Sequence, residues 1–187
     1  MDIKIPFSMI IVSKRNSGKS YLTKHLLKMF MDEKKLFDYV VLFSSTASMT
    51  DDFDCLPKKA IQDDFSTSKI NKILEHQKKS KESKTPKQCL VILDDTIGAK
   101  IDTEFRTNLD LLFSRGRHYN TSILFISQYI KNYISTTIRN NIDYLIFSVN
   151  NYNVLKVIYD LVVFDGNIKE FIKFRMGVFN SRVGATD

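Results

Sequence analysis

The stretch "PFSMIIVSKRNSGKS", residues Pro6–Ser20, decides the fold of this chain. Its first half is a short apolar run that predicts a buried β-strand, and its second half is a polar turn rich in small residues. A phosphate-binding loop needs a buried strand to aim it, small residues whose backbone N–H groups converge on oxygen atoms, and a following helix whose N-terminus faces the anion. We therefore interpret residues Ser13–Ser20 as such a loop.

The loop departs at one position from the usual pattern of Gly, four residues, then Gly-Lys-Ser/Thr. Gly18, Lys19 and Ser20 match this pattern, whereas Ser13 stands where the first glycine would be. Serine lacks the freedom of glycine at positive φ, so either Ser13 has an ordinary backbone conformation or the loop bends differently. Lys19 is expected to reach the β- and γ-phosphates of ATP, and Ser20 to ligate Mg²⁺. The expected nucleotide contacts are Ser13, Arg15, Asn16, Ser17, Gly18, Lys19, Ser20 and Tyr21.

Composition limits the class of protein. A chain of 187 residues fits one compact domain, so we expect a single domain over residues 1–187. The formal charge of +7 is compatible with a polyanionic partner, although solubility alone would also explain it. The only two cysteines, Cys55 and Cys89, make a disulfide framework unexpected. No apolar stretch approaches the roughly 20 residues that span a bilayer, and we expect a soluble, intracellular protein.

Apolar runs alternate with helical patterns along the chain. Short runs rich in β-branched residues predict strands, at Phe7–Val12, Tyr39–Phe43, Cys89–Leu93, Ser122–Ile126 and Tyr144–Val149. Apolar residues at helical spacing predict helices, at Ser20–Met31, Ser66–Gln77, Ile101–Phe113 and Ile168–Phe174. Strands that are continuously apolar and alternate with helices indicate an α/β fold, with a mainly parallel sheet and helices on both faces.

The segment Lys78–Lys87 differs from its surroundings. It holds five lysines, one glutamate and a proline, with no apolar residue, and this predicts an exposed, mobile basic loop. A loop of this composition is usually just solvated, and contact with DNA is the alternative.

Two carboxylates follow the apolar run at residues 89–93. In open α/β sheets ligands bind at the carboxyl ends of the strands, where Asp94 and Asp95 are expected to lie. Asp94 is suited to hold Mg²⁺, directly or through water, and Asp95 to orient and deprotonate the attacking water. Many such ATPases have glutamate at the second position. Because aspartate reaches about one methylene less far, the role of Asp95 is the less secure of the two.

The stretch "SRGRHYNTSILFISQ", Ser114–Gln128, adds two arginines and a polar residue at a strand end. Gln128 could contact both the γ-phosphate and the attacking water, and so report the nucleotide state. Arg115 and Arg117 fit an arginine finger that acts in the site of a neighbouring subunit. The alternative is that each caps helix carbonyls or pairs with an acid.

Together the ordered motifs SKRNSGKS, VILDD, RGRHYNTSILFISQ and IRNNIDYLIF resemble the genome-packaging ATPases of large nucleocytoplasmic DNA viruses and virophages, within the FtsK–HerA superfamily of P-loop NTPases. The resemblance implies a RecA-like core with an additional strand between the phosphate-loop strand and the Walker B strand. It also implies a ring of subunits, a pentamer or hexamer, that drives double-stranded DNA into a preformed capsid with ATP and Mg²⁺. In this superfamily a glutamine like Gln128 is the sensor and arginines act in trans.

The resemblance extends to partners and location. It implies capsid or portal components as partners, no membrane span, and a place in the host cytoplasm or viral factory, or in the virion. The expected DNA contacts are Lys100, Lys131 and the Lys78–Lys87 segment. The short length and abrupt end suggest either a minimal member or a chain truncated at its C-terminus.

Two other functions remain open from the residues. A nucleotide or nucleoside kinase has a similar loop and size, but no arginine-rich lid is evident. A non-hydrolysing assembly scaffold with a degenerate loop would account for Ser13 and Asp95. A transporter ATPase is disfavoured because there is no Leu-Ser-Gly-Gly-Gln stretch, and adenine is the default base because there is no Asn-Lys-x-Asp sequence.

Overall fold

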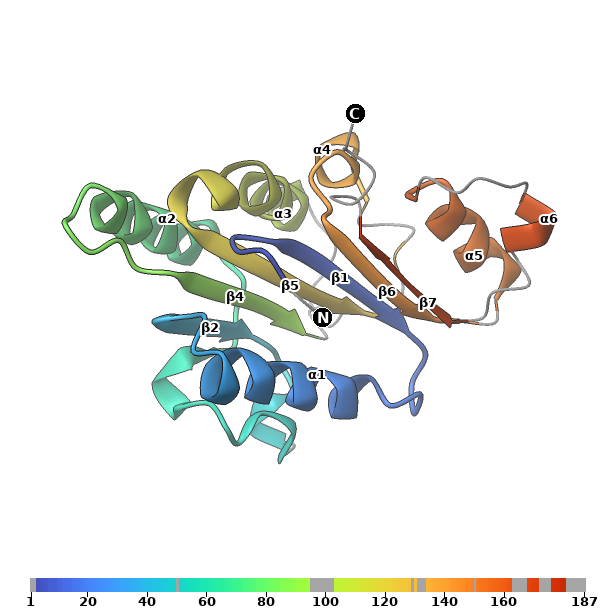
Figure 1. Cartoon of the computed structure of the whole chain (residues 1–187), viewed down its shortest axis with the longest axis horizontal. Coiled ribbons are helices and arrows are strands. Elements are labelled where there is room, and N and C mark those ends of the chain that lie inside the picture. Colours follow the sequence, from blue (N-terminus) through green and yellow to red (C-terminus); the bar gives the residue numbers. More distant parts are fainter. Residues whose placement is uncertain are drawn as a thin grey trace.

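A computed structural model of the chain describes residues 3–49, 51–94, 103–128, 130, 134–149, 151–162, 168–171 and 176–180. Within this part of the chain, seven strands form one sheet in the order β3-β2-β4-β5-β1-β6-β7 (Figure 1). All neighbouring strands are parallel except β6 and β7, which are antiparallel. The strands are β1 Ser8–Ser13, β2 Tyr39–Phe43, β3 Ile61–Gln62, β4 Cys89–Asp94, β5 Thr121–Ser127, β6 Tyr144–Ser148 and β7 Met176–Asn180.

The strand order confirms the RecA-like arrangement. β5 lies between β1, which leads into the phosphate loop, and β4, which ends at Asp94. β5 pairs in parallel with both neighbours along nearly its whole length. The additional strand implied by the family resemblance is therefore β5, and its carboxyl end lies between those of the other two.

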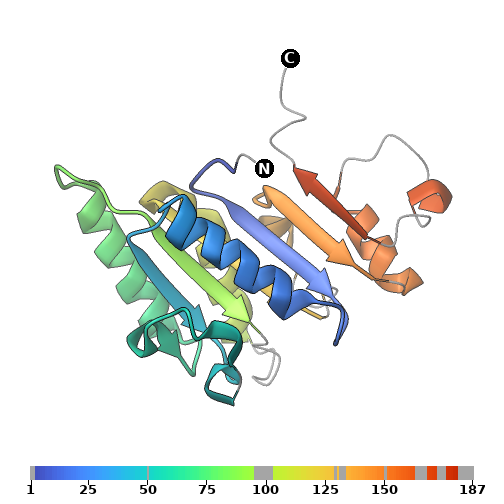
Figure 2. The same ribbon diagram turned by 60° about the horizontal axis from the view of Figure 1, so that its bottom comes forward.

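Helices cover both faces of the sheet, as expected. Helix α1 lies across one face, and α2 and α3 lie on the other (Figures 1 and 2). Buried residues of α4, α5 and α6 belong to the same apolar cluster as those of α2 and α3. The helices are α1 Lys19–Lys28, α2 Thr67–Lys81, α3 Thr103–Arg115, α4 Thr136–Arg139, α5 Tyr152–Tyr159 and α6 Ile168–Phe171. None of the described helices is long and apolar enough to cross a membrane.

Strand β1 divides its side chains between two cores. Ile10 and Val12 pack on the α2–α3 face, and Met9 and Ile11 pack on the α1 face. This division follows from the strand period of two, and burial on both faces explains why the run is continuously apolar. The two described cysteines are both free, Cys55 exposed and Cys89 buried in β4, where burial raises the pKa of the Cys89 thiol to about 12.

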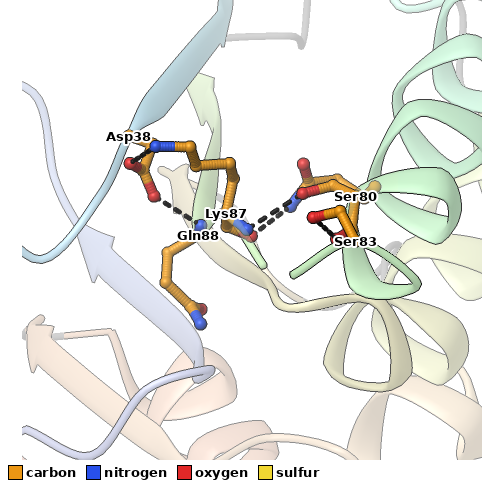
Figure 3. A network of polar contacts seen from close by, with 6 residues as sticks. Asp38, Ser80, Ser83, Lys87 and Gln88 are labelled. Carbon is orange, nitrogen blue, oxygen red and sulfur yellow. Dashed lines mark hydrogen bonds and ion pairs between the residues drawn. The ribbon is translucent and has the colours of Figure 1, made fainter. Parts of the chain in front are cut away.

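The lysine-rich segment differs from its prediction. Helix α2 continues to Lys81, four residues beyond the expected end, so the first part of the predicted loop is helical. The return to β4 is held by hydrogen bonds from Lys87 N–H to Ser80 Oγ (2.9 Å) and from the Lys87 ammonium to Asp38 (2.9 Å) (Figure 3). The Gln88 N–H and the Lys87 ammonium hold the pKa of Asp38 below its ordinary value. The mobility of the segment stays a prediction.

Other predicted elements agree with the structure to within a few residues, and some elements were not predicted. The five predicted strands all exist, and their ends move by at most one residue. The unpredicted elements are short or lie outside the alternating pattern: β3, α4, α5 and the antiparallel strand β7. Residues 101–102 of the third predicted helix and residues 172–174 of the last one lie outside the described part of the chain.

Phe7 is the centre of an aromatic cluster that anchors the start of β1. Its ring lies 5.5 Å from that of Phe30, 5.9 Å from that of Phe37 and 6.1 Å from that of Tyr144. We expect Phe7→Ala to lower the free energy of unfolding by about 4 kcal/mol, because the cavity left by the ring cannot collapse among three rigid rings. Urea denaturation measures this change. Met49→Ala, at a residue 80% exposed, should change it by no more than about 0.5 kcal/mol, and equal effects of the two variants would contradict the packing assignment.

Candidate nucleotide site

The phosphate loop begins where β1 ends. Ser13 is the last residue of β1 and is buried, and its hydroxyl contacts the hydroxyl of Ser17 across the loop. Ser17 Oγ also donates to the Lys14 carbonyl oxygen at 2.6 Å. Ser13 is not among the described residues with positive φ, so its position does not require glycine. The departure from the usual sequence pattern therefore leaves an ordinary strand end, closed by a contact between two serines.

The positive φ angles of the loop fall at Asn16 and Gly18. Asn16 has a φ of 59°, which asparagine tolerates better than most residues, and Gly18 has a φ of 84°. A Cβ atom at Gly18 would meet nothing within 4 Å, so this glycine is required by backbone conformation and not by space. The loop turns back at these two residues and enters α1.

Helix α1 presents its N-terminus at the end of this turn. Gly18 is the N-cap residue and supplies no side-chain hydrogen bond to the first turn. The first N–H groups of a helix have no partner within the helix, and they carry the positive end of its dipole. Lys19 is half-buried, and Ser20 and Tyr21 are exposed beside it. Uncapped N–H groups, a lysine and a serine hydroxyl at one helix start fit a polyphosphate.

Asp94 and Gln128 lie at the same edge of the sheet as the loop. Asp94 is the last residue of β4 and lies opposite Ile126 of β5, and Gln128 directly follows β5. Ser127 in turn lies opposite Val12 of β1. Because the three strands are parallel neighbours, their carboxyl ends bring both side chains to the edge that carries the loop. Asp95 lies outside the described residues, so its role as a base stays a prediction.

A pocket of about 350 Å³ lies beside the loop. Its lining joins Lys14 and Arg15 of the loop to Gln128 and to residues that follow β6: Val149, Asn151 and Val154. The Asn151 side chain caps α5, since its Oδ1 accepts hydrogen bonds from the N–H groups of Asn153 (2.9 Å) and Val154 (3.4 Å). Val149, Asn151 and Val154 were not predicted from the sequence as site residues. Asn151 carried a helix-capping signal, but nothing in the sequence pointed to a pocket.

The two arginines lie at the amino ends of the parallel strands, opposite the end that carries the phosphate loop. Arg115 is the exposed last residue of α3, and Arg117 follows in a 3-10 turn over Gly116–Tyr119. The Arg117 guanidinium donates to Asp143 Oδ1 at 2.6 Å, and Asp143 Oδ2 accepts from the N–H of Ser8, the first residue of β1, at 2.8 Å. Asp143 is only 3% exposed. Arg117 thus pairs with an acid, the alternative left open by the sequence, whereas Arg115 forms no ion pair with any described residue.

Three expected residues lie outside the part of the chain that the structure describes. Lys100 and Lys131, proposed as DNA contacts, lie outside the described residues, as does Asp95. Within the Lys78–Lys87 segment, Lys81 donates to the His118 carbonyl oxygen at 2.7 Å, which joins the end of α2 to the turn that carries Arg117. The lysine-rich segment and the two arginines therefore lie near each other, at the amino ends of the strands and away from the phosphate loop.

The strand order and the phosphate loop define the class of this protein as a P-loop NTPase with a RecA-like core. The sequence profile of the poxvirus A32 protein family matches residues 2–184, and the chain belongs to that family. It is 29% identical over 150 residues to the uncharacterized protein 015R of Frog virus 3 (isolate Goorha). That alignment covers 76% of this chain and 44% of the relative, so the chain spans less than half of the relative's length.

Similar folds occur among solved structures. The DNA-packaging ATPase B204 from Sulfolobus Turreted Icosahedral Virus has a TM-score of 0.70 and 14% identity, over 97% of this chain and 95% of that one. The genome packaging NTPase B204 from Sulfolobus turreted icosahedral virus 2, solved with ATP-gammaS, has a TM-score of 0.64 and 16% identity, over 97% and 95%. EssC from Geobacillus thermodenitrificans has a TM-score of 0.61 and 16% identity, over 95% and 38%. At these identities the similarity is one of fold.

The two arginines should differ in their effect on stability. We expect Arg117→Ala to lower the free energy of unfolding by about 2 kcal/mol, because it removes a charge-assisted hydrogen bond to the buried Asp143 carboxylate. Arg115→Ala should change it by no more than about 0.5 kcal/mol, because Arg115 is exposed and forms no ion pair with any described residue. Thermal and urea denaturation of both variants measure the difference. Equal stability of the two variants would contradict a structural role for the Arg117–Asp143 pair.

Proposed function

We propose that this chain is an ATP-driven translocase of double-stranded DNA that packages a viral genome into a preformed capsid, and that it hydrolyses ATP at the subunit interfaces of a ring. One observation carries the proposal: the phosphate loop, Asp94 and Gln128 lie at the carboxyl ends of three adjacent parallel strands. Membership of the poxvirus A32 family and the fold shared with two viral packaging ATPases support the same function.

The residues of the loop fit the triphosphate of ATP. The uncapped N–H groups at the start of α1 would bind phosphate oxygens, and Lys19 would neutralise charge on the β- and γ-phosphates. Ser20 and Asp94 are oxygen donors of the kind that Mg²⁺ prefers, and they would hold the ion against the phosphates. Bound there, the ion would neutralise charge that develops on the leaving phosphate oxygens.

The end of β5 would couple the nucleotide to the domain. Gln128 would orient the attacking water, and it would lose a contact when the γ-phosphate leaves. Asp95 follows Asp94 in the chain and is our proposed base for that water. A nucleotide-dependent contact at the end of a central strand is the kind of switch a motor needs.

Arg115 is the better candidate for the trans-acting finger. Arg115 lies near the amino ends of the parallel strands. Because β1 has six residues, about 20 Å of strand separates these amino ends from the phosphate loop of the same subunit. An arginine there would serve the site of a neighbour. A ring of identical subunits, a pentamer or hexamer, would bring the amino ends of one subunit's strands to the next subunit's loop, and the capsid or its portal would be a further partner. Such a motor would act in the host cytoplasm or viral factory, or in the virion.

Loss of the loop lysine should abolish hydrolysis. We expect Lys19→Ala to lower the rate of phosphate release from ATP by on the order of 100-fold or more, since one preorganised cation at the phosphates is lost. Lys24→Ala, an exposed lysine on the same helix, is the matched control and should keep the wild-type rate. Phosphate release is measured with Mg²⁺, with and without double-stranded DNA.

The same assay separates the alternative functions. Stimulation of the wild-type rate by double-stranded DNA supports the translocase. Phosphorylation of a nucleoside or nucleotide without DNA stimulation would identify a kinase instead. Absence of turnover in both the wild-type protein and the Lys19→Ala variant would identify a scaffold and overturn the proposal.

Mixed rings test the role of Arg115. Arg115→Ala should abolish turnover while nucleotide binding survives, because the arginine acts on the transition state in another subunit's site. Mixing this variant with Lys19→Ala should restore part of the activity, since some interfaces then join an intact loop to an intact arginine. Arg106→Ala, an exposed arginine on the same helix α3, is the control. Mixed rings that assemble and stay inactive would argue against action in trans.

A further inference from the structure

The outer edge of the sheet at β2 is only partly covered. β3 pairs with β2 only through Leu42–Ile61 and Phe43–Gln62. β2 and β3 are parallel, so the first three residues of β2, Tyr39–Val41, precede the start of β3 and pair with no described strand on that side. β2 itself lies beside β4 near the outer edge of the sheet (Figure 1). An uncovered strand edge presents unpaired N–H and C=O groups that can pair with another chain.

The direction of the exposed peptide groups follows from the strand geometry. Successive residues of a parallel strand donate to opposite sides. The Tyr39 N–H donates toward β4, to the Gln88 carbonyl oxygen at 3.2 Å, and the Ser44 N–H donates toward β3, to the Gln62 carbonyl oxygen at 3.0 Å. Val40 shares the parity of Ser44, so its N–H points outward to the uncovered side.

A groove of about 570 Å³ runs along this edge, between β2 and α2. Its wall is mostly apolar and includes Val41, Phe43 and Ile73. Tyr39 is 43% exposed at the groove, and its ring meets that of His76 edge-on, with 5.3 Å between the ring centroids. An apolar slot beside an uncovered strand suits alternate side chains of an extended peptide.

The rim of the groove is basic. Lys69 pairs with Asp64, and Asp38, the acidic residue in the lining, is paired with Lys87. Two further lysines in the lining, Lys59 and Lys72, are exposed and form no ion pair with any described residue. The groove therefore offers positive charge that no described carboxylate neutralises, and acidic side chains complement it.

We propose that this edge groove, defined by Tyr39, Val40, Lys59, Lys72 and His76, binds an extended segment of a partner protein that alternates apolar and acidic side chains. The segment adds a strand beside β2, pairs with the Val40 peptide group, packs apolar side chains against the slot and directs carboxylates to Lys59 and Lys72. The groove shares no residue with the phosphate loop, so the proposal does not depend on the proposed function.

Binding of a defined peptide tests the proposal. The probe is a fluorescein-labelled peptide of about eight residues, the length of an ordinary strand, that alternates Val or Ile with Glu. Fluorescence anisotropy on the full chain should show saturable binding that weakens as salt is raised. A peptide with Lys in place of each Glu is the matched probe and should bind at least about tenfold more weakly.

Two variants locate the binding site. Val40→Pro removes the outward N–H while sparing the ladder to β4, as proline is tolerated on edge strands. Lys59→Glu combined with Lys72→Glu reverses the rim charge without touching the backbone. Each should weaken binding of the acidic peptide by at least about tenfold, whereas Lys28→Glu, on the other face of the sheet, should not.

Several outcomes would overturn the proposal. They are absence of saturable binding by the wild-type chain, equal binding of the acidic and basic peptides, and retention of affinity in the Lys59→Glu, Lys72→Glu double variant. If sedimentation shows that the chain dimerises and that Val40→Pro makes it monomeric, the edge pairs with a second copy of this chain instead. The double variant keeps the test decisive if Val40→Pro fails to fold.

Discussion

The burial of β1 between β5 and β6 is the constraint on which the site depends. The strand is enclosed by parallel neighbours on both sides and by a core on each face. A strand held in this way cannot shift its register without moving its apolar side chains between the two faces. The direction of the chain at Ser13 is therefore fixed, and with it the place where the loop turns and α1 begins. The geometry of the loop is a consequence of strand packing.

The parallel sheet also keeps the phosphate-binding groups apart from the two arginines. The carboxyl ends of the parallel strands lie on one side of the domain, and this side carries the loop, Asp94 and Gln128. The side with the amino ends of the strands carries Arg115, Arg117 and the end of α2. A groove along the side of the sheet, at β2, is a third surface with its own charge. One sheet therefore presents phosphate-binding groups, arginines and an uncovered strand on different sides, which suits a subunit with several neighbours.

Prediction from the sequence succeeded for the elements that a local pattern of apolar residues determines. Apolar runs identified the five central strands because most of their side chains are buried or partly buried, and the loop sequence identified the turn into α1. It missed β3, because two residues form no periodic pattern, and β7, because an antiparallel edge strand lies outside the alternating order. It ended α2 too early, because the lysines at its C-terminal end looked like a loop, although cations are favourable there. Asp143 carried no signal, since its partners are 26 and 135 residues away in the chain.

The sequence left both Arg115 and Arg117 as candidates for an arginine finger, and their tertiary contacts distinguish them. An arginine finger accelerates phosphoryl transfer by roughly 10³- to 10⁵-fold, which corresponds to roughly 4 to 7 kcal/mol. Arg117 would first have to leave Asp143, and losing a hydrogen bond to a charged group costs about 1.5 to 3 kcal/mol. Part of the gain would then be offset within the subunit that supplies the arginine. Arg115 is exposed and forms no ion pair with a described residue, so it can enter a neighbouring site without this cost. The buried acid thus holds the turn in place, and the arginine before that turn is left available.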